Sequence, residues 1–155
     1  MIEIKAASDF FLDIQNRFSV FLAGSIEMGK AEKWQDKVVK LLEEDDVIVL
    51  NPRRDDWDSS WEQTDGDNEF TKQVEWELLA QTYCDLIIMY FDPNTTSPIT
   101  LLELGLFGAT HPQSIVVCCP EGFYRKGNVD VTCRWYGIKQ VNSIEELVNE
   151  VKGRL

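Results

Sequence analysis

Residues 85–109 read DLIIMYFDPNTTSPITLLELGLFGA and begin with the most strand-like run of the chain, DLIIMYF, at 85–91. Branched aliphatic and aromatic side chains favour extended backbone, so this run predicts a buried β-strand. A polar turn follows, after which Ser97 is suited to cap a helix and Pro98 to occupy its first position. A buried strand that leads directly into a helix is the repeating unit of parallel sheets.

The same alternation of strands and helices extends in both directions from this stretch. Further strands are predicted at 17–25, 47–52, 114–120 and 138–141, and further helices at 31–44, at 70–83 and from Ser143 onward, where Glu146 completes a capping box. Residues 1–16 are expected to form an extended arm that ends in a short turn. The pattern predicts a single α/β domain over 1–155, a doubly wound parallel sheet of four to five strands with helices on both faces, of the Rossmann or flavodoxin type.

In this architecture ligands bind beyond the carboxyl ends of the strands. The segments expected at that edge are Gly24–Ser25, 51–58 and 92–97, together with the first turns of the helices that follow. The run FLAGSIEMG at 21–29 lacks the glycine spacing of a dinucleotide-binding or phosphate-binding loop. Gly24 and Ser25 are nevertheless placed to offer backbone N–H groups to a polar ligand atom at a helix N-terminus.

One carboxylate, Glu103, stands in the apolar part of the opening stretch. An ionised carboxylate in apolar surroundings is costly unless it is paired, hydrogen-bonded or neutralised. Helical spacing puts Glu103 in the second turn, near the strand-end crevice and on the face of Leu106 and Phe107, while Gly105 and Gly108 would let the helix approach its neighbours closely. A nucleophilic or acid–base role in a dry pocket is one interpretation. A solvated glutamate on an amphipathic helix is the other.

The preceding helix carries two more carboxylates, Glu75 and Glu77, which point in different directions, so at most one of them easily faces the crevice. The polar loop at 51–61 is rich in Asp, Ser and Trp. Within it, Asp56 offers a hydrogen-bond acceptor and Trp57 a stacking surface. Exposed tryptophan is costly, so a contact with a ligand or a partner chain is one interpretation, and a solvated polar loop is the alternative.

The charge balance limits the classes of partner. The 155 residues include 27 acidic and 15 basic side chains, which gives a formal net charge of -12. Such a field repels the phosphate backbone of nucleic acids and anionic membrane surfaces. The sequence has no apolar run of the roughly 18 residues that a membrane span needs, and its start lacks a signal-peptide pattern. We therefore expect a cytoplasmic protein that binds small molecules, with no nucleic acid and no membrane as partner.

The cysteines and the single histidine do not indicate a metal site. The four cysteines lack zinc-type spacing, and the neighbours Cys118 and Cys119 would point to opposite faces of a strand, so buried free thiols are expected. His111 follows a helix-like segment and precedes Pro112, which favours a capping or surface role. A histidine-based metal site is hard to build from one ligand, and no metal is predicted.

Four segments together resemble the nucleoside 2-deoxyribosyltransferase-like family. These segments are FLAGS (21–25), NPRRDDW (51–57), the helix that leads into CDLIIMYF (84–91), and SPITLLELG (97–105). They occur in the order found in the family, and the resemblance extends from about Val20 to Val117. Each segment is moderately specific by itself, and the ordered combination is much more so.

The resemblance implies a chemistry for the carboxylates. Glu103 matches the glutamate of the family's E-L-G segment, the nucleophile at the anomeric carbon, and Glu77 matches by its spacing to Asp85 the acidic residue that holds the sugar hydroxyls and the nucleophile. Retaining exchange of bases through a glycosyl-glutamate ester is then expected, with Glu77 the candidate to protonate the departing base. Asp56 and Trp57 are the candidates for base recognition. The expected ligands are a nucleoside and a nucleobase, and neither a metal nor an organic cofactor is expected.

The turn before the glutamate departs from the family pattern. Well-studied members often have a D-x-G-T-like turn there, whereas this chain has Ser97, Ile99 and Thr100. Ser97 thus replaces an aspartate that would help bind the sugar, and it joins Gly24 and Ser25 as a substrate-binding candidate. Two alternatives follow: an N-glycosidic hydrolase of nucleosides or nucleotides, in which water replaces the acceptor base, and a module that binds a nucleoside or nucleotide derivative without catalysis.

Two further expectations concern phosphate and assembly. A nucleotide substrate would need phosphate donors, and only Ser25, Arg53 and Arg54 lie near the predicted crevice. The resemblance implies a homo-oligomer, because members of the family often complete each pocket with residues of a neighbour. Trp135 and Tyr136, in a predicted loop after the fourth strand, are candidates for such an interface, with core packing as the alternative.

Overall fold

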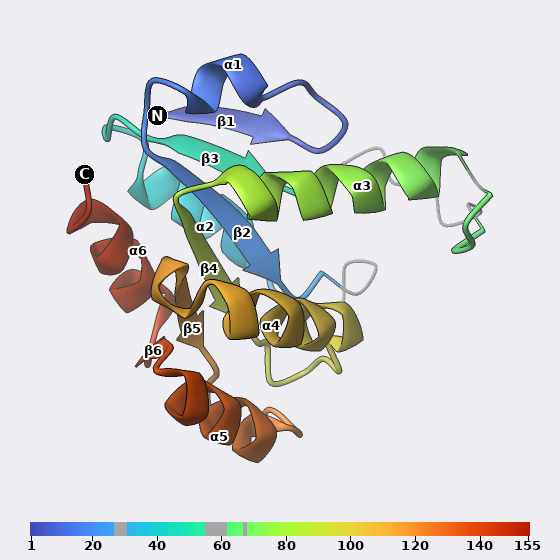
Figure 1. Cartoon of the computed structure of the whole chain (residues 1–155). Coiled ribbons are helices and arrows are strands. Elements are labelled where there is room, and N and C mark those ends of the chain that lie inside the picture. The colour runs from blue at the N-terminus through green and yellow to red at the C-terminus, as the bar shows by residue number, and fades with distance from the viewer. Residues whose placement is uncertain (27–30, 55–61, 67) are drawn as a thin grey trace.

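Six parallel strands form one sheet in the computed structural model, which describes residues 1–26, 31–54, 62–66 and 68–155 (Figure 1). The strands are β1 (Ile2–Lys5), β2 (Ser19–Gly24), β3 (Ile48–Asn51), β4 (Leu86–Tyr90), β5 (Ile115–Cys118) and β6 (Lys139–Val141). Their order across the sheet is β1-β3-β2-β4-β5-β6, and every neighbouring pair is parallel. The predicted doubly wound α/β fold is therefore confirmed, with six strands rather than four to five.

Helices cover both faces of the sheet (Figure 1). The core on one face includes residues from α3 (Asn68–Tyr83), α4 (Pro98–Thr110) and α5 (Lys126–Tyr136), with the short α1 (Phe11–Ile14) beside them. The core on the other face includes residues from α2 (Trp34–Leu41) and α6 (Ile144–Lys152). Successive residues of β4 alternate between the two cores, as Ile87 and Ile88 do, which explains why the strand is apolar throughout.

The edges of the sheet differ from the sequence-based expectation. The extended part of the segment 1–16 is β1, which pairs with β3 from Ile2 to Lys5. Only one residue of this strand is buried, so its sequence carries little of the signal of a core strand. The predicted loop after β5 contains α5, and Trp135 and Tyr136 lie at the end of that helix with 80% and 43% of their surfaces exposed. Core packing of these two side chains is thus excluded.

The strand order fixes where a ligand crevice belongs. From β2 the chain passes to β3 on one side and then crosses to β4 on the other, so the direction of winding reverses between β2 and β4. In doubly wound sheets ligands bind at the carboxyl ends of the strands beside such a switch point. The segments there are Gly24–Ser25, at the end of β2, and 92–97, between β4 and α4.

Gly24 allows the two central strands to approach closely at that edge. A Cβ atom at this position would lie 2.5 Å from the carbonyl oxygen of Tyr90 and 2.8 Å from the ring of Trp34. The first of these neighbours is backbone and cannot move aside. The next N–H group, that of Ser25, donates to the same Tyr90 carbonyl at 3.1 Å and extends the pairing of β2 with β4. The N–H group of Ser25 is therefore used within the sheet and is not available to a ligand.

Candidate active site

Glu103 lies in the second turn of α4 with only 8% of its surface exposed. Its carboxylate oxygen Oε1 accepts a hydrogen bond of 2.6 Å from Nε2 of Gln81, near the end of α3. The hydrogen bond joins two helices that cover the same face of the sheet. The solvated position that was the alternative from the sequence is thus excluded for this residue.

The buried face of α4 differs in part from the predicted one. Thr100, Leu104, Phe107 and Gly108 are buried together with Glu103. The prediction that Leu106 shares this face is wrong, because the buried stripe passes through Phe107, four residues after Glu103, and leaves Leu106 48% exposed. Gly105 also faces open space. A Cβ atom at Gly108 would lie 3.0 Å from Cδ1 of Ile138, so only this glycine permits the expected close approach.

Glu77 is the second carboxylate of the site. Its Oε1 accepts a hydrogen bond of 2.7 Å from Nε2 of Gln73, one turn earlier on α3. The amide nitrogen of Gln81 contacts both the backbone carbonyl of Glu77 and the Glu103 carboxylate, and the charge of Glu77 raises the pKa of Glu103. Glu75 instead is exposed and lines a separate hollow between α1 and α3. As the helical spacing predicts, at most one of the two α3 glutamates faces the crevice, and that one is Glu77.

The electrostatics of the pair favour its protonated forms. Burial and, to a lesser extent, the charge of Glu77 raise the pKa of Glu103 to about 8, against the opposing effect of the Gln81 hydrogen bond. Burial raises the pKa of Glu77 to about 7, against the hydrogen bond from Gln73. Two interacting carboxylates, one buried and one half-buried, can hold one proton between them near neutral pH, which suits one group as an acid and the other as a nucleophile.

Sequence reasoning missed the two glutamines that bind the carboxylates. Gln73 and Gln81 stand four residues before and after Glu77, and an interval of four places side chains on the same helix face. Both are buried, with 5% and 3% of their surfaces exposed. That spacing is a signal that the sequence does carry, since buried glutamine beside a glutamate on one face indicates a polar contact within the protein or with a ligand.

A cluster of buried hydroxyls lies at the switch point. The hydroxyls of Ser25, Thr95 and Ser97 contact one another, with 2.9 Å between Thr95 and Ser25 and 2.7 Å between Thr95 and Ser97. The backbone N–H of Asp92 donates to the Ser25 hydroxyl at 3.0 Å. The ends of β2 and β4 are thus joined by side chains at the point where the fold places a ligand.

Ser97 performs a different role from the predicted one. It is the residue before the first turn of α4, and Pro98 follows at the helix start as expected, but the serine side chain makes no capping hydrogen bond. Its backbone is left-handed, with φ of 43°, and its hydroxyl is turned into the buried cluster. A capping serine needs extended backbone to reach back to the helix, so this geometry excludes the cap.

The loop after β3 is described only in part. Asp56 and Trp57, the candidates for base recognition, lie outside the described residues. The Arg53 guanidinium donates to Oε1 of the buried Gln35 at 3.3 Å. Arg54 lies 3.9 Å from Glu69 at the start of α3. Both arginines therefore already have acceptors within the protein.

The comparison with protein families agrees with this geometry. The family described as nucleoside 2-deoxyribosyltransferase like matches residues 17–123, more than half of the chain. The chain belongs to this family. No individual curated protein matches the sequence. The resemblance read from the four sequence segments is thus confirmed, and with it the general class of function, which concerns nucleosides and nucleobases as small-molecule ligands.

The region that matches the nucleoside 2-deoxyribosyltransferase-like family contains both carboxylates and the hydroxyl cluster. It runs from just before β2 to just after β5. The strand β1 and the helices α5 and α6 lie outside the match. The family match therefore covers the switch point and the helices α3 and α4 that carry the acidic pair.

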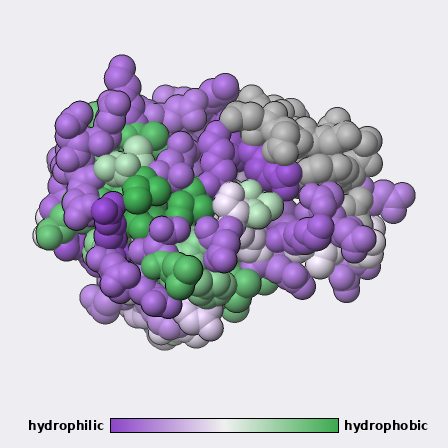
Figure 2. All heavy atoms as spheres, turned by 90° about the horizontal axis from the view of Figure 1, so that it is seen from above, coloured by the Kyte–Doolittle hydropathy of each residue, from purple (hydrophilic) through white to green (hydrophobic). Residues whose placement is uncertain are grey.

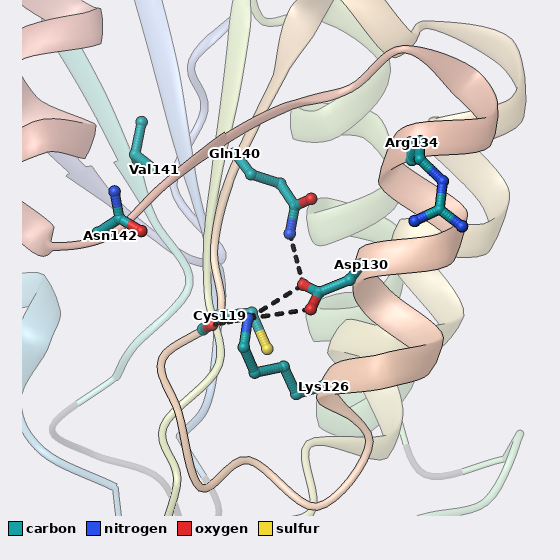
Figure 3. A pocket seen from close by; sticks show the side chains of 7 residues that line it. All are labelled: Cys119, Lys126, Asp130, Arg134, Gln140, Val141 and Asn142. Atoms are coloured by element: carbon teal, nitrogen blue, oxygen red, sulfur yellow. Dashed lines mark hydrogen bonds and ion pairs between the residues drawn. The ribbon is translucent and has the colours of Figure 1, made fainter.

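A polar pocket of about 470 Å³ lies at another part of the same edge, between β5, β6 and α5 (Figure 3). Within it, Lys126 donates to Asp130 at 3.2 Å and to the carbonyl of Cys119 at 3.1 Å, and Gln140 donates to Asp130 at 2.8 Å. Arg134 also lines this pocket. Most of its lining lies beyond the family match, and none of the site residues predicted from the sequence contributes to it.

The described part of the chain also bears on the remaining predictions. All four cysteines are free thiols, and Cys118 and Cys119 point into opposite cores as predicted. His111 ends α4 at the protein surface, and its backbone N–H donates to the Phe107 carbonyl. Among the described residues, no three His, Cys, Asp or Glu side chains are grouped as a metal ion would require. No helix there has the length and apolar character to span a membrane.

Proposed function

We propose that this chain transfers a 2-deoxyribosyl group from one nucleobase to another through a covalent ester on Glu103. The observation that carries the proposal is the pair of carboxylates on neighbouring helices, buried Glu103 and half-buried Glu77, of which Glu103 stands in the position of the family's E-L-G glutamate. Such a pair can divide the roles of nucleophile and acid. The family match supports the substrate class.

In the first step an oxygen of ionised Glu103 attacks the anomeric carbon of the nucleoside. Because Glu103 has the higher pKa of the two, this reactive form, with the proton on Glu77, is the less populated of the two singly protonated forms. The new carbon–oxygen bond forms while the bond from that carbon to the base nitrogen breaks, and its electron pair leaves with the base. Glu77 gives its proton to the departing base. The sugar passes through an oxocarbenium-like state and is held as an ester of Glu103.

In the second step a nitrogen of the incoming base attacks the anomeric carbon from the opposite face. The ester carbon–oxygen bond breaks, which returns Glu103 as a carboxylate, and Glu77 takes the proton that the incoming base releases. Two inversions give net retention. The apolar surroundings of Glu103 favour a base over water as acceptor, because they keep water from the ester.

Substrate binding is assigned, as part of this proposal, to the residues at the switch point. Ser25 and Ser97 contribute hydroxyls, and Gly24 lets the ends of β2 and β4 come together where these hydroxyls lie. Asp56 and Trp57, which lie outside the described residues, are proposed to recognise the base by hydrogen bonding and stacking. The proposed location of the protein is the cytoplasm, where such ligands are present.

The test is chromatography of the purified protein incubated with deoxyinosine and adenine, beside a sample without adenine and the variant Glu103→Gln. Newly formed deoxyadenosine that the variant does not produce is the expected result. Hypoxanthine released equally with and without adenine, and no deoxyadenosine, would replace the transferase with a hydrolase. Tight nucleoside binding without turnover, unchanged in Glu103→Gln, would indicate a binding module and contradict the proposal.

We also propose that the chain forms a homo-oligomer. Phe11 and Tyr83 pack against each other at 5.4 Å between ring centroids, and with Leu12 and Leu79 they leave large exposed apolar surfaces on α1 and α3. Figure 2, a view onto the α1 side, shows hydrophobic atoms gathered on this face. Sedimentation velocity is expected to give a mass above that of one chain. A single species of 17.9 kDa would contradict the assembly.

A further inference from the structure

Gln73 and Gln81 make the same pair of contacts at two places on α3. The Nε2 group of Gln81 donates to the backbone carbonyl of Glu77 at 3.3 Å and to the carboxylate of Glu103 at 2.6 Å. The Nε2 group of Gln73 donates to the backbone carbonyl of Pro52 at 3.0 Å and to the carboxylate of Glu77 at 2.7 Å. Each amide nitrogen therefore joins one carboxylate to one fixed point of the backbone.

These contacts determine which way each amide group faces. A glutamine nitrogen has two N–H donors, and here both neighbours of each nitrogen are oxygen acceptors. When the carboxylates are ionised, the reversed amide would place its oxygen against a carbonyl and a carboxylate, neither of which can donate a hydrogen bond. The two contacts of each amide nitrogen thus fix the orientation of the amide group, and each amide holds one oxygen of its carboxylate in place.

The oxygen atoms of the two amide groups are in a different situation from the nitrogen atoms. Oε1 of Gln73 and Oε1 of Gln81 are buried, and neither has a hydrogen-bond partner among the residues that the structure describes. A buried acceptor without a donor is rare, and at a functional site it indicates a group that a ligand completes. The complement of a carbonyl oxygen is a hydroxyl or an N–H donor. Sugar hydroxyls and the N–H groups of nucleobases are donors of this kind.

We propose that Gln81 and Gln73 are positioning residues for Glu103 and Glu77, each fixing one carboxylate oxygen through its N–H groups and offering Oε1 to a donor of the bound nucleoside. This inference rests on the proposed function for the identity of the ligand. An amide suits the task because it orients a carboxylate without bringing a full positive charge, whereas lysine or arginine would form an ion pair that holds the nucleophile in its ground state.

The positioning by Gln81 has a consequence that a purely structural contact lacks. A hydrogen bond to the ionised form of a carboxylate favours that form, so the loss of the Gln81 donor raises the pKa of Glu103. We expect the variant Gln81→Met, which keeps the length of the side chain, to move the Glu103 titration upward by about one pH unit. Carbon-13 NMR of the labelled glutamate carboxyl groups, assigned with Glu103→Gln, measures this midpoint without any turnover.

The matched control is Gln140→Met. Gln140 also donates to a carboxylate, that of Asp130, but at the other pocket of the strand-end edge. This variant is expected to leave the Glu103 midpoint unchanged. Circular dichroism and thermal unfolding verify that both variants are folded. A folded Gln81→Met protein whose Glu103 midpoint equals that of the wild type would overturn the inference.

A second measurement needs no variant at Gln81. In proton–nitrogen spectra of the wild type, the side-chain amide signals of Gln81 are expected to shift with pH at the midpoint of Glu103. Amide signals that do not follow this midpoint would contradict the contact.

The base-exchange assay separates the positioning role from the transferase proposal. If Gln81→Met shifts the Glu103 midpoint and the wild type exchanges no base, the positioning role is supported and the transferase is rejected. If the wild type exchanges bases and Gln81→Met leaves the midpoint unshifted, the transferase is supported and the positioning role is rejected.

Discussion

Asp130 and Glu103 each accept a hydrogen bond from a glutamine amide, and their surroundings give them opposite properties. Asp130 lies beside Lys126 and Gln140 at the edge of an open pocket; burial pushes its pKa up, but these two partners outweigh it and hold the pKa below the ordinary value. Glu103 has Gln81 but is buried beside another carboxylate, and its pKa rises to about 8. The amide contact is common to both. Burial and the charge of the nearest neighbour decide whether a carboxylate serves as an ion pair or as a titrating group.

The comparison predicts that replacing Glu103 has the largest effect. Glu103→Gln keeps the shape of the side chain and removes the attacking oxygen, so we expect base exchange to fall by at least about a thousandfold. Asp130→Asn is the matched control, since it makes the same change from carboxylate to amide outside the acidic pair and should leave exchange within about twofold. Initial rates by chromatography measure both. Equal losses of exchange activity in Glu103→Gln and Asp130→Asn would show that the two carboxylates do not differ in their importance for exchange.

Replacing Glu77 should have the next largest effect. Glu77→Gln removes the proposed proton donor, and we expect exchange to fall by roughly a hundredfold, within the range of general acid catalysis. The wild-type rate should follow a bell with its maximum between about 7 and 8, because activity needs the pair to hold one proton. The falling alkaline limb is expected to disappear in Glu77→Gln. If the alkaline limb persists in Glu77→Gln, it arises from the titration of another group.

The stability of the fold should depend on the same pair. Glu103 and Glu77 bind protons more tightly in the folded chain than in the unfolded one, where the ordinary pKa is 4.5. Their contribution is thus fully present below about pH 4.5 and is lost as the pH rises through 7 and 8.

Between these limits we expect the wild-type free energy of unfolding to fall by several kcal/mol, since each unit by which a pKa is raised corresponds to about 1.4 kcal/mol. In Glu103→Gln the decrease should be smaller, because one of the two titrating groups is absent. Urea unfolding across this pH range measures both slopes. A wild-type stability that rises with pH through this window would show that burial does not dominate at the acidic pair.

The smallest effect is expected at Asp130. Lys126→Met removes the cation that lies 3.1 Å from this carboxylate, so its pKa should rise. Because the carboxylate is partly exposed, the rise is expected to be less than about one pH unit and to shrink as salt is added. Carboxyl NMR at two ionic strengths measures it. A rise as large as the shift at Glu103 would mean that exposure does not weaken the ion pair.

The sequence was sufficient for the centre of the fold and for the acidic pair. Apolar strands such as 85–91 are buried on both faces, which leaves a strong pattern, and a lone carboxylate in an apolar helix pointed to Glu103. The same reasoning failed where burial is slight. β1 buries a single residue, and α5 begins after a glycine-containing loop and carries exposed aromatic side chains, so neither has a strong periodic signal.

The contacts within the site were harder to predict, because they depend on distance in space. Nothing near Glu103 in the chain indicates that Gln81, twenty-two positions away, is its partner. The side chain of Ser97 illustrates a second reason. Serine before a proline-initiated helix normally predicts a cap, but the backbone at Ser97 is left-handed, and tertiary contacts with Ser25 and Thr95 override the local preference.

The left-handed backbone at Ser97 also bears on which residue types this position accepts. A serine in that conformation is less stable by roughly 1 kcal/mol than in ordinary backbone, whereas aspartate and asparagine tolerate it better. The Ser97 hydroxyl, however, is buried against those of Ser25 and Thr95, and an aspartate here would bury a carboxylate among them. The backbone conformation thus favours one residue type at this position, and the surroundings of the side chain favour another.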